Sequence, residues 1–321
     1  MSGLRVVVVG GGSWGTAFAW LLTQRGHEVT LACRDAEQVR VIREEHRNPR
    51  YSTSADLTGI DATLVDDAPY DAADVVVAAV PSRVFRGVVE TIPGTAPVLG
   101  LTKGLDPGTG ERLSHAVHGR RYALLSGPNM AEEVLQGLPT AAVIASDDAE
   151  LGATLQAAIN SPTFRIYVND DLLGVELCAA AKNVIGLAAG GVDGLGLGDN
   201  AKAALITRGL AEMRRLGEAA GADPDTFAGM AGMGDLIVTC WHPSGRNRRA
   251  GELIARGASP AEAEAAIGQV VEGLTTAPVL QRLSQRLGAE LPITDGVCSV
   301  LGGVTLTELV SSLMGRAPTE E

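Results

Sequence analysis

Aromatic residues are scarce in this chain of 321 residues, which contains 4 Phe, 4 Tyr and 3 Trp. Proteins that bind single-stranded nucleic acid stack successive bases on aromatic side chains along a basic groove. This chain has 26 basic and 38 acidic residues, which gives a formal net charge of −12. The composition therefore argues against a nucleic-acid partner, and an anionic small molecule would need a local basic pocket.

Cysteines are also few, and they lie far apart in the sequence at Cys33, Cys178, Cys240 and Cys298. The chain has no CxxC pair and no Cys/His spacing of the kind that binds a metal. The apolar run that begins at residue 4 is too short for a signal peptide or a membrane span. We therefore expect a reduced, cytoplasmic protein with no metal site and no integral membrane association.

Lysine is the rarest charged residue, with Lys103, Lys182 and Lys202 set against 23 arginines. A lysine can exchange a proton near neutral pH when its surroundings favour the neutral amine, whereas an arginine stays charged. Each lysine therefore raises the question of why arginine would not serve at that position.

Glycine, in contrast, is abundant at 40 residues, and three glycines form a recognisable motif. Gly10, Gly12 and Gly15 spell GxGxxG directly after an expected strand and at the start of an expected helix. In this context the glycines let a pyrophosphate approach the backbone, and the helix N-terminus at Ser13 offers N–H groups and a positive dipole end. The motif predicts a dinucleotide-binding loop, and the alternative is an ordinary glycine-rich turn.

The end of the second expected strand bears on the choice of dinucleotide. Arg34 lies 19 residues past Gly15 and is followed by Asp35. An acid here would bind the adenosine ribose hydroxyls, and an arginine favours a ribose 2′-phosphate. Arg34 therefore favours NADP over NAD, while Asp35 is either a helix cap or the ribose ligand.

Two kinds of pattern divide the chain. Up to about residue 168, short apolar runs alternate with helical patterns, which is typical of βα units on a mostly parallel sheet. After Asn169 the pattern is helical, so we expect an α/β domain at 1–170 and an all-helical domain at 171–321. The expected strands are 4–9, 28–33, 74–80, 96–100, 122–125, 141–145 and 164–167; the expected helices are 14–25, 35–45, 83–91, 148–159, 172–189, 200–220, 261–267 and 274–287, with Asp35 and Ser82 as N-caps.

Lys182 lies in the helical run ELCAAAKNVIGLAAG, and no acidic residue lies three or four positions away. A lysine amine that projects from such an apolar face is desolvated. Desolvation favours the neutral amine, which makes the lysine a candidate general acid or base. The alternative is a lysine whose stem crosses apolar surface to reach water. The residues alone leave both interpretations open.

Further polar candidates follow strands or begin helices. Lys103 in GLTKGL follows the expected fifth strand, at the edge of an open sheet where ligands bind, although a solvated loop lysine fits equally well. The segment Ser126 to Asn129 also lies between a strand and a helix. Asp235 and the run GRNRR from Gly245 are the densest polar features of the second half, and the run is either an anion site or a solvated helix start. Lys202, three residues after Asp199, is expected to form a local ion pair.

The segments that carry these residues resemble bacterial sn-glycerol-3-phosphate dehydrogenases that use NAD(P). The resemblance covers nearly the whole chain and rests on GGGSWGTAFA, VPSRVF, TKGL, SGPNMAEEV, ELCAAAKNVIGLAAG, NAKAALITRGLAEMRRLG, GMGDLIVTC, GRNRRAG and GQVVEG. It implies an N-terminal Rossmann-like domain and an all-helical C-terminal domain that together interconvert dihydroxyacetone phosphate and sn-glycerol 3-phosphate. It also implies a homodimer that supplies glycerol 3-phosphate for glycerophospholipid synthesis.

The resemblance also assigns roles to positions of this sequence. Lys182 matches the catalytic lysine, which would give and take the proton. The cofactor positions, with the glycine motif, are Gly10, Gly12, Ser13, Trp14, Gly15, Arg34, Lys103, Ala131, Arg246, Val270 and Glu272; the substrate positions are Lys103, Gly127, Asn129, Asp235, Gly245, Arg246 and Asn247. The family usually has Ser at position 245, and Ser or Thr at 129 with Phe at 130, where this chain has Gly245, Asn129 and Met130.

Two other functions are alternatives to this one. The first is a related two-domain dehydrogenase that acts on another small hydroxy acid or phosphorylated sugar acid. The second is a non-catalytic sensor that uses the same fold to bind a dinucleotide. The presence of Lys182 together with Arg246 and Asn247 disfavours a sensor, which needs neither proton transfer nor a second anion site.

Overall fold

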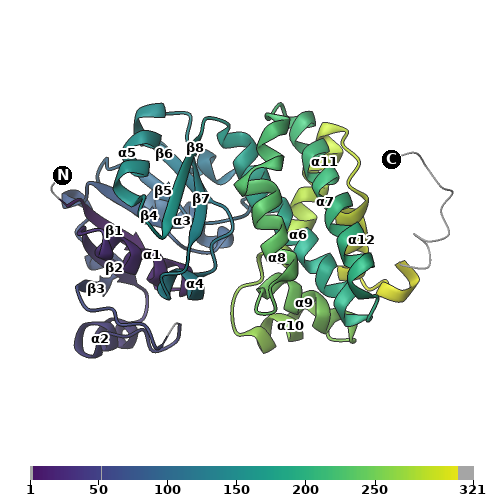
Figure 1. Ribbon diagram of the computed structural model, residues 1–321, viewed down its shortest axis with the longest axis horizontal. Helices are drawn as coiled ribbons and strands as arrows, with labels where there is room; N and C mark the ends of the chain where they lie inside the picture. The colour runs from purple at the N-terminus through teal and green to yellow at the C-terminus, as the bar shows by residue number, and fades with distance from the viewer. Residues whose placement is uncertain (1–2, 52, 310–321) are drawn as a thin grey trace. The chain divides into compact units, whose positions relative to one another are not determined.

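The computed structural model describes residues 3–51 and 53–309 (Figure 1). The chain forms two compact units. The first comprises residues 1–106 and 111–176, and the second comprises residues 107–110 and 177–321.

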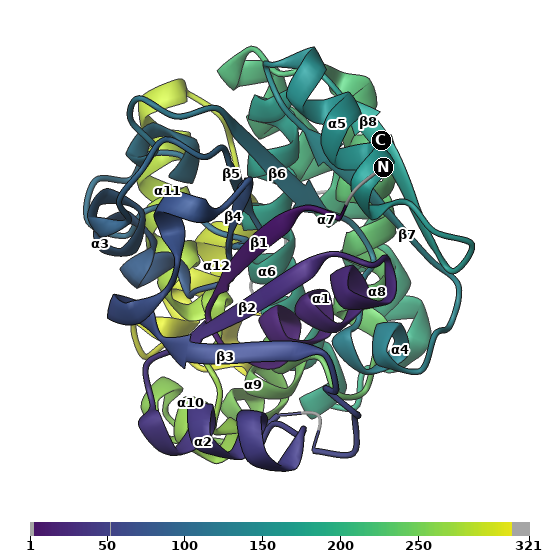
Figure 2. The same cartoon turned by 90° about the vertical axis from the view of Figure 1, so that its left-hand side faces the viewer.

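An eight-stranded sheet forms the centre of the first unit, in the order β3-β2-β1-β4-β5-β6-β7-β8. All neighbouring strands are parallel except β6 and β7, which confirms the mostly parallel sheet. Figure 2 shows β3, β2 and β1 side by side. The strands are β1 (Arg5–Val9), β2 (Glu28–Cys33), β3 (Ile60–Leu64), β4 (Val75–Ala78), β5 (Val98–Gly100), β6 (Tyr122–Ser126), β7 (Thr140–Ala145) and β8 (Phe164–Asn169).

The strand β1 shows why these apolar runs form a buried sheet. Successive side chains of a strand point to opposite faces. Val6 and Val8 accordingly join the larger apolar cluster on one face, whereas Val7 and Val9 join a smaller cluster on the other. A parallel sheet that is covered on both faces needs continuous apolar strands, which is what RVVVV and VVVA supply.

The helices of the first unit are α1 (Ser13–Gln24), α2 (Ala36–Glu45), α3 (Ser82–Thr91), α4 (Ala131–Leu135) and α5 (Ala149–Ile159). Asp35 caps α2, as expected, and its carboxylate accepts hydrogen bonds from the N–H groups of Glu37 and Gln38. The expectation for Ser82 is wrong. Pro81 is the N-cap of α3, and Ser82 is its first helical residue and is buried.

The second unit is helical. Its helices are α6 (Leu172–Gly194), whose first turn belongs to the first unit, α7 (Gly198–Ala220), α8 (Asp235–Trp241), α9 (Arg246–Ala255), α10 (Pro260–Ile267), α11 (Glu272–Leu287) and α12 (Pro292–Leu301). A π-helical turn, Met230–Gly234, leads directly into α8. Helices α8, α9 and α12 were not among the predicted elements.

Glycines on α6 let other helices of the second unit approach it closely. A side chain on Gly190 would collide with the Arg248 carbonyl of α9, and one on Gly194 would lie 2.7 Å from the Glu252 carbonyl. Gly186 lies under Thr239 of α8. These glycines therefore serve close packing between helices.

Helix α6 is long and apolar enough to cross a membrane by length and composition. However, 89% of its most apolar 18-residue window is buried inside the structure. The core helix of a soluble domain has the same length and composition.

Candidate active site

The glycine loop lies between β1 and α1 and leaves the start of α1 open. Gly12 is the N-cap of α1, and no side chain caps this helix. A Cβ atom added at Gly12 would meet nothing within 4 Å, whereas one at Gly15 would collide with the Gly10 carbonyl oxygen. Gly10 has φ +117°, a conformation that favours glycine. The loop can therefore bind a pyrophosphate against the N–H groups that begin at Ser13.

Two buried amides that the sequence analysis missed support this loop. The Gln38 amide donates to the Gly11 carbonyl at 2.6 Å. The Asn48 amide donates to the same carbonyl at 3.1 Å and to the Thr16 hydroxyl at 2.8 Å. Asn48 is fully buried, so these contacts fix the loop from behind. Asn48 lies outside any periodic pattern, and the sequence offered no signal for it.

The side chains of Arg34 and Asp35 differ in their hydrogen bonds and ion pairs. The Asp35 carboxylate caps α2 and also forms an ion pair with Arg50. Asp35 is therefore the helix cap, one of the two roles left open for it. Arg34 is exposed, and its side chain makes no hydrogen bond or ion pair with the described residues.

Lys103 lies in a loop after β5 and contacts two of the predicted substrate residues. Its ammonium donates to the Gly127 carbonyl and to the Asn129 side-chain oxygen, both at 3.0 Å. Gly127 has φ +124°, a conformation that favours glycine. The Asn129 side-chain nitrogen is buried and has no partner among the described residues. A buried donor without a partner is costly, so this amide fits a ligand that brings an acceptor.

Trp14 and Ala131 lie at the starts of two helices of the first unit, α1 and α4. Trp14 is the second residue of α1, and its ring lies 5.8 Å from that of Phe18 and 6.5 Å from that of Phe164. Its indole nitrogen is buried without a partner in the part of the chain that the structure describes. Ala131 is the first residue of α4, which also lacks a side-chain cap.

Lys182 in the second unit is buried rather than extended to water. Its ammonium donates to the Asp235 carboxylate at 2.6 Å and to the Thr239 hydroxyl at 3.0 Å. The side chains of Lys182 and Asp235 are only 7% and 2% exposed. The partners lie on α6 and α8, more than fifty residues apart in the sequence. Of the two interpretations of Lys182, the stem that reaches solvent is therefore wrong.

Asn247 links three helices next to this pair. Its side-chain nitrogen donates to the Asn183 side-chain oxygen at 2.8 Å, and its oxygen accepts from the Gly273 N–H at 2.8 Å. Asn183 follows Lys182 on α6, and the sequence analysis did not single it out. One N–H of the Asn247 amide is left for a further contact, because the amide carries two.

The basic run begins α9. Gly245 is the N-cap of α9, and no side chain caps this helix. Arg246 is exposed at the first helical position and donates to the Gln269 side chain at 3.0 Å. Val270 and Glu272 flank Val271, the N-cap of α11. The first turn of α9 thus combines N–H groups, a positive dipole end and a guanidinium, which suits an anion.

Lys202 does not form the expected pair with Asp199. Its ammonium lies 2.6 Å from the Asp193 carboxylate, which also pairs with Arg248, and 5.0 Å from the centre of the Trp241 ring. The pairing joins α6, α7 and α9, which local helical spacing could not indicate.

The two units therefore present different chemical groups. The first unit presents an open glycine loop beside Arg34, and a lysine held by Gly127 and Asn129. The second unit presents a buried lysine–carboxylate pair and an uncapped helix start with Arg246. The first set suits a dinucleotide, and the second suits proton exchange and an anionic group.

Comparisons with known proteins agree with these features. Residues 5–152 match the N-terminal model of NAD-dependent glycerol-3-phosphate dehydrogenase, and residues 171–311 match the C-terminal model. A glycerol-3-phosphate dehydrogenase [NAD(P)+] of Halorhodospira halophila is 44% identical over 98% of both chains, and one of Corynebacterium glutamicum is 42% identical over 99% of this chain and 100% of its own. The crystal structure of glycerol-3-phosphate dehydrogenase from Coxiella burnetii superimposes with a TM-score of 0.93 at 36% identity, over 98% of this chain and 100% of that chain. This chain therefore belongs to the NAD-dependent glycerol-3-phosphate dehydrogenase family.

Proposed function

We propose that this chain is a glycerol-3-phosphate dehydrogenase that interconverts dihydroxyacetone phosphate and sn-glycerol 3-phosphate. The observation that carries the proposal is the buried Lys182 ammonium, held by Asp235 and Thr239 in a chain whose relatives bear that name. When bound, the nicotinamide of NAD or NADP supplies or accepts the hydride at C2 of the substrate. The work of this chain's residues is to bind, to orient and to move one proton.

Lys182 would move that proton. Reduction of the substrate carbonyl places negative charge on the oxygen at C2, and a nearby ammonium stabilises this charge and can protonate it. The Asp235 carboxylate accepts a hydrogen bond from the ammonium at 2.6 Å, and the Thr239 hydroxyl accepts a second one, so the two residues hold the ammonium in one orientation. In the oxidation direction the neutral amine takes the proton back.

The substrate phosphate would bind at the start of α9. The uncapped first turn offers N–H groups, and Arg246 offers a guanidinium that suits a phosphate. Asn247 would donate its second amide N–H, while its other contacts fix its position. Gly245 brings no side chain, so the contribution of this position comes from the backbone or from water. Binding energy at the phosphate positions C2 for reaction.

The residues around Lys103 would contact the reacting end of the substrate. The ammonium, held by Gly127 and Asn129, would polarise the carbonyl and lie near the cofactor. The buried Asn129 nitrogen would donate to a substrate oxygen, which explains why it has no partner within the described residues. Asn129 can make this contact although the family usually has a hydroxyl residue at the position.

The first domain, residues 1–170, would bind the cofactor, and residues 171–321 would bind the substrate and carry the catalytic lysine. The pyrophosphate fits the loop from Gly10 to Gly15, since Gly12 opens onto space and α1 is uncapped. The remaining cofactor contacts in our proposal are Ser13, Trp14, Ala131, Val270 and Glu272, together with Arg246, which would face both ligands.

The dinucleotide we favour is NADP. Arg34 is exposed and makes no contact with the described residues, whereas Asp35 is already engaged by the start of α2 and by Arg50. A guanidinium in this place suits a 2′-phosphate. Arg34→Ala should therefore raise the Kd for NADPH and leave that for NADH nearly unchanged. Equal changes for both dinucleotides would overturn the preference.

The proposed biological setting rests on the family resemblance and on the composition of the chain. The chain would act in the cytoplasm as a homodimer and supply glycerol 3-phosphate for glycerophospholipid synthesis. Sedimentation of the purified protein over a range of concentrations tests the dimer, and a monomer at all concentrations contradicts it.

The decisive experiment follows NADPH absorbance after dihydroxyacetone phosphate is added. The assay is repeated with NADH and with unphosphorylated dihydroxyacetone. We expect oxidation that requires the phosphate. Tight NADPH binding without turnover on the phosphorylated substrate would overturn the proposal in favour of a sensor or of a dehydrogenase with another substrate.

Three variants assign the roles in the same assay. Lys182→Ala should lower kcat by about 100-fold or more, because general acid catalysis contributes about 10²–10⁴-fold. Lys182→Arg keeps the charge but not the proton exchange, so full activity in this variant would limit the role of Lys182 to electrostatics. Arg246→Ala should raise KM for the phosphorylated substrate by about 10-fold or more, as expected for a lost charged hydrogen bond. An unchanged KM would remove Arg246 from the phosphate site.

A further inference from the structure

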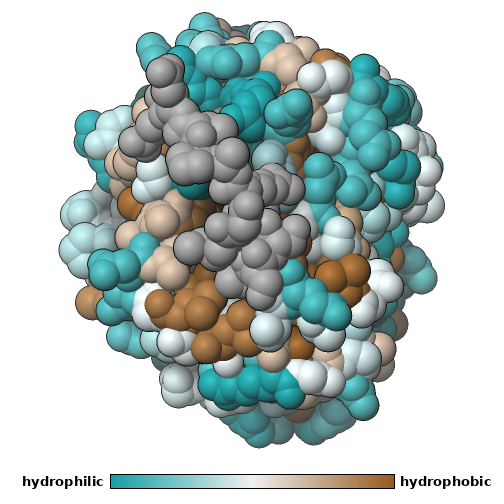
Figure 3. Space-filling view, turned by 90° about the vertical axis from the view of Figure 1, so that its right-hand side faces the viewer, coloured by the Kyte–Doolittle hydropathy of each residue, from teal (hydrophilic) through white to brown (hydrophobic). Residues whose placement is uncertain are grey.

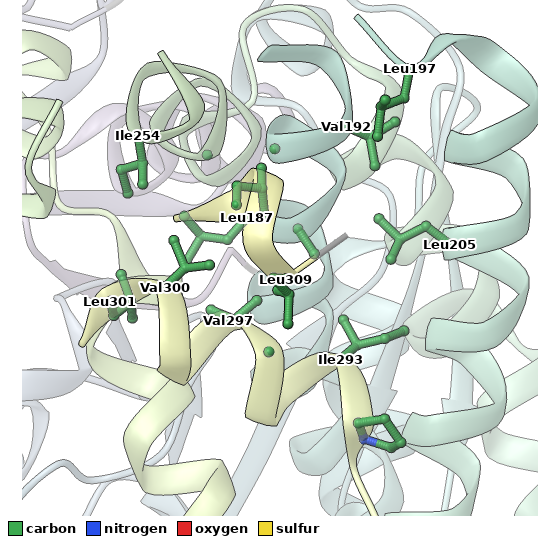
Figure 4. A pocket seen from close by; sticks show the side chains of 16 residues that line it. Leu187, Val192, Leu197, Leu205, Ile254, Ile293, Val297, Val300, Leu301 and Leu309 are labelled. Carbon is green, nitrogen blue, oxygen red and sulfur yellow. The ribbon is translucent and has the colours of Figure 1, made fainter. Parts of the chain in front are cut away.

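An apolar groove lies in the helical unit between α6, α7, α9 and α12 (Figure 4). Every residue that lines it is apolar or glycine, including Leu187 and Val192 of α6, Leu205 of α7, Ile254 of α9 and Val297 of α12. Figure 3 shows apolar side chains gathered on one face of the molecule. An extended apolar surface of this kind marks a place where another apolar element binds.

A helical turn of the chain enters this groove just before residue 310. Residues 306–309 are helical, and Thr305 and Glu308 specify the start of the turn. The Glu308 carboxylate accepts from the Thr305 N–H at 2.9 Å, and the Thr305 hydroxyl accepts from the Glu308 N–H at 3.2 Å. This reciprocal pair is a capping box, which begins a helix through local contacts alone.

Leu306 and Leu309 of this turn already line the groove. The neighbouring helices have glycine where these leucines approach. A Cβ atom on Gly191 of α6 would lie 2.8 Å from Leu306, and one on Gly296 of α12 would lie 3.0 Å from Leu309. The groove is therefore shaped to accept side chains of this turn.

The sequence after residue 309 continues the same pattern. Val310, Leu313 and Met314 lie four, seven and eight positions after Leu306, which is the spacing of one apolar helix face. Ser311 and Ser312 fall on the opposite face. Gly315 and Pro318 follow, as is typical just beyond the end of a helix.

We propose that the groove binds the chain's own segment Val310–Met314 as the continuation of this capped turn, so that the C-terminal segment acts as a clasp on the helical unit. The tether favours this occupant over a second copy or a free apolar ligand. The segment directly follows Leu309, which already lines the groove, so its effective concentration there is in the millimolar range or above. This proposal is independent of the enzymatic function.

The test compares two double variants of the full-length chain that add the same charge. L313D/M314D places carboxylates on the apolar face, and the control S311D/S312D places them on the opposite face. Thermal unfolding, hydrogen exchange of residues 301–314 and fluorescence of an apolar dye are measured for both and for the parent chain. We expect protected amides at 310–314 in the parent chain. We also expect L313D/M314D to lower Tm by about 3–8 °C, to lose this protection and to bind more dye, while the control changes little.

Four outcomes would overturn the clasp. The first is exchange at 310–314 at the rate of an unfolded peptide in the parent chain, and the second is an equal fall in Tm for both variants. The third and fourth concern the occupant. If protection at 310–314 increases with protein concentration, and L313D/M314D dissociates an assembly that sedimentation detects, the groove binds the segment of a second copy. If a fluorescent fatty acid binds the parent chain as tightly as it binds L313D/M314D, the groove is a ligand site.

Discussion

Replacement of one partner of the Lys182–Asp235 pair should destabilise the helical unit, and replacement of both should restore most of the stability without activity. The pair has an Nζ–Oδ1 distance of 2.6 Å, and both side chains are almost completely buried. A buried pair of this kind often contributes little net stability, because desolvation of two charges offsets their attraction. Removal of one partner is different, since it leaves a buried charge uncompensated.

The expected magnitude follows from this burial. Loss of one partner of a buried pair costs about 3–5 kcal/mol. In Asp235→Asn the Thr239 hydroxyl still accepts from the Lys182 ammonium, so we expect a value near the lower end, about 3 kcal/mol. A domain of this size changes its Tm by about 2–4 °C per kcal/mol, which gives a fall of about 10 °C for the helical unit.

The assay combines differential scanning calorimetry with NADPH oxidation for Lys182→Met, Asp235→Asn and the double variant. We expect both single variants to be destabilised, the double variant to unfold within a few degrees of the parent chain, and all three to be inactive. Lys103→Met in the first unit is the control, and it should lower activity without moving the transition of the helical unit. If the double variant is destabilised by the sum of the two single effects, the two charges are not coupled and the reasoning fails.

Further predictions concern the first unit. Gly12→Ala should fold normally, because its Cβ would meet open space, but it should bind NADPH weakly, because that space is where we place the pyrophosphate. Gly15→Ala should fail to fold, because its Cβ would collide with the Gly10 carbonyl oxygen. Parent-like binding of NADPH by Gly12→Ala in a calorimetric titration would contradict this prediction. Asn48→Ala should cost about 1–3 kcal/mol and weaken NADPH binding, because it removes buried hydrogen bonds behind the glycine loop; an unchanged Kd would count against that support. The hydrogen bond from Arg121 lowers the pKa of Asp148 from 3.8 to about 2, so the ionised carboxylate stabilises the folded state. This stabilisation is complete above pH 3.8 and is lost as the pH falls through about 2. Asp148→Asn should therefore flatten the acid-unfolding curve between these values, and an unchanged curve monitored by circular dichroism would refute the linkage.

The sheet was largely predictable, because apolar runs of strand length can be recognised in the sequence alone. The strand β2 runs from Glu28 to Cys33 as predicted, and the other predicted strands lie within a few residues of their observed ends. The strand β3, Ile60–Leu64, was missed because it lies at the edge of the sheet and its sequence IDATL is short and interrupted by an aspartate. Helices α8 and α12 were missed because their sequences, DLIVTCW and PITDGVCSVL, are rich in β-branched residues, which are more typical of strands. For α9 the sequence indicated only a possible helix start at the run from Gly245.

The candidate site residues could be selected one by one from the sequence, but their contacts could not. The GxGxxG spacing and the two lysines could be selected from the sequence, because each depends on local context. The partner of Lys182 could not, since Asp235 lies on another helix and only packing brings the two together. The same holds for Asn48, whose hydrogen bonds to the glycine loop span more than thirty residues.

The rarity of lysine has a physical explanation that also shows its limit as a functional signal. None of the three lysines is exposed, and the ammonium of each lies within 3.0 Å of an oxygen: Lys103 of a carbonyl and an amide oxygen, Lys182 and Lys202 of carboxylates. A compact ammonium fits such places, whereas the wide, planar guanidinium of arginine does not. Yet Lys202 is paired with Asp193 and lies over the Trp241 ring, in an arrangement that joins helices. A rare lysine thus identifies a position where arginine does not fit. A second observation is needed to distinguish catalysis from packing at such a position. For Lys182 it is the hydrogen bond that joins its neighbour Asn183 to Asn247 in the uncapped first turn of α9, which can hold an anion.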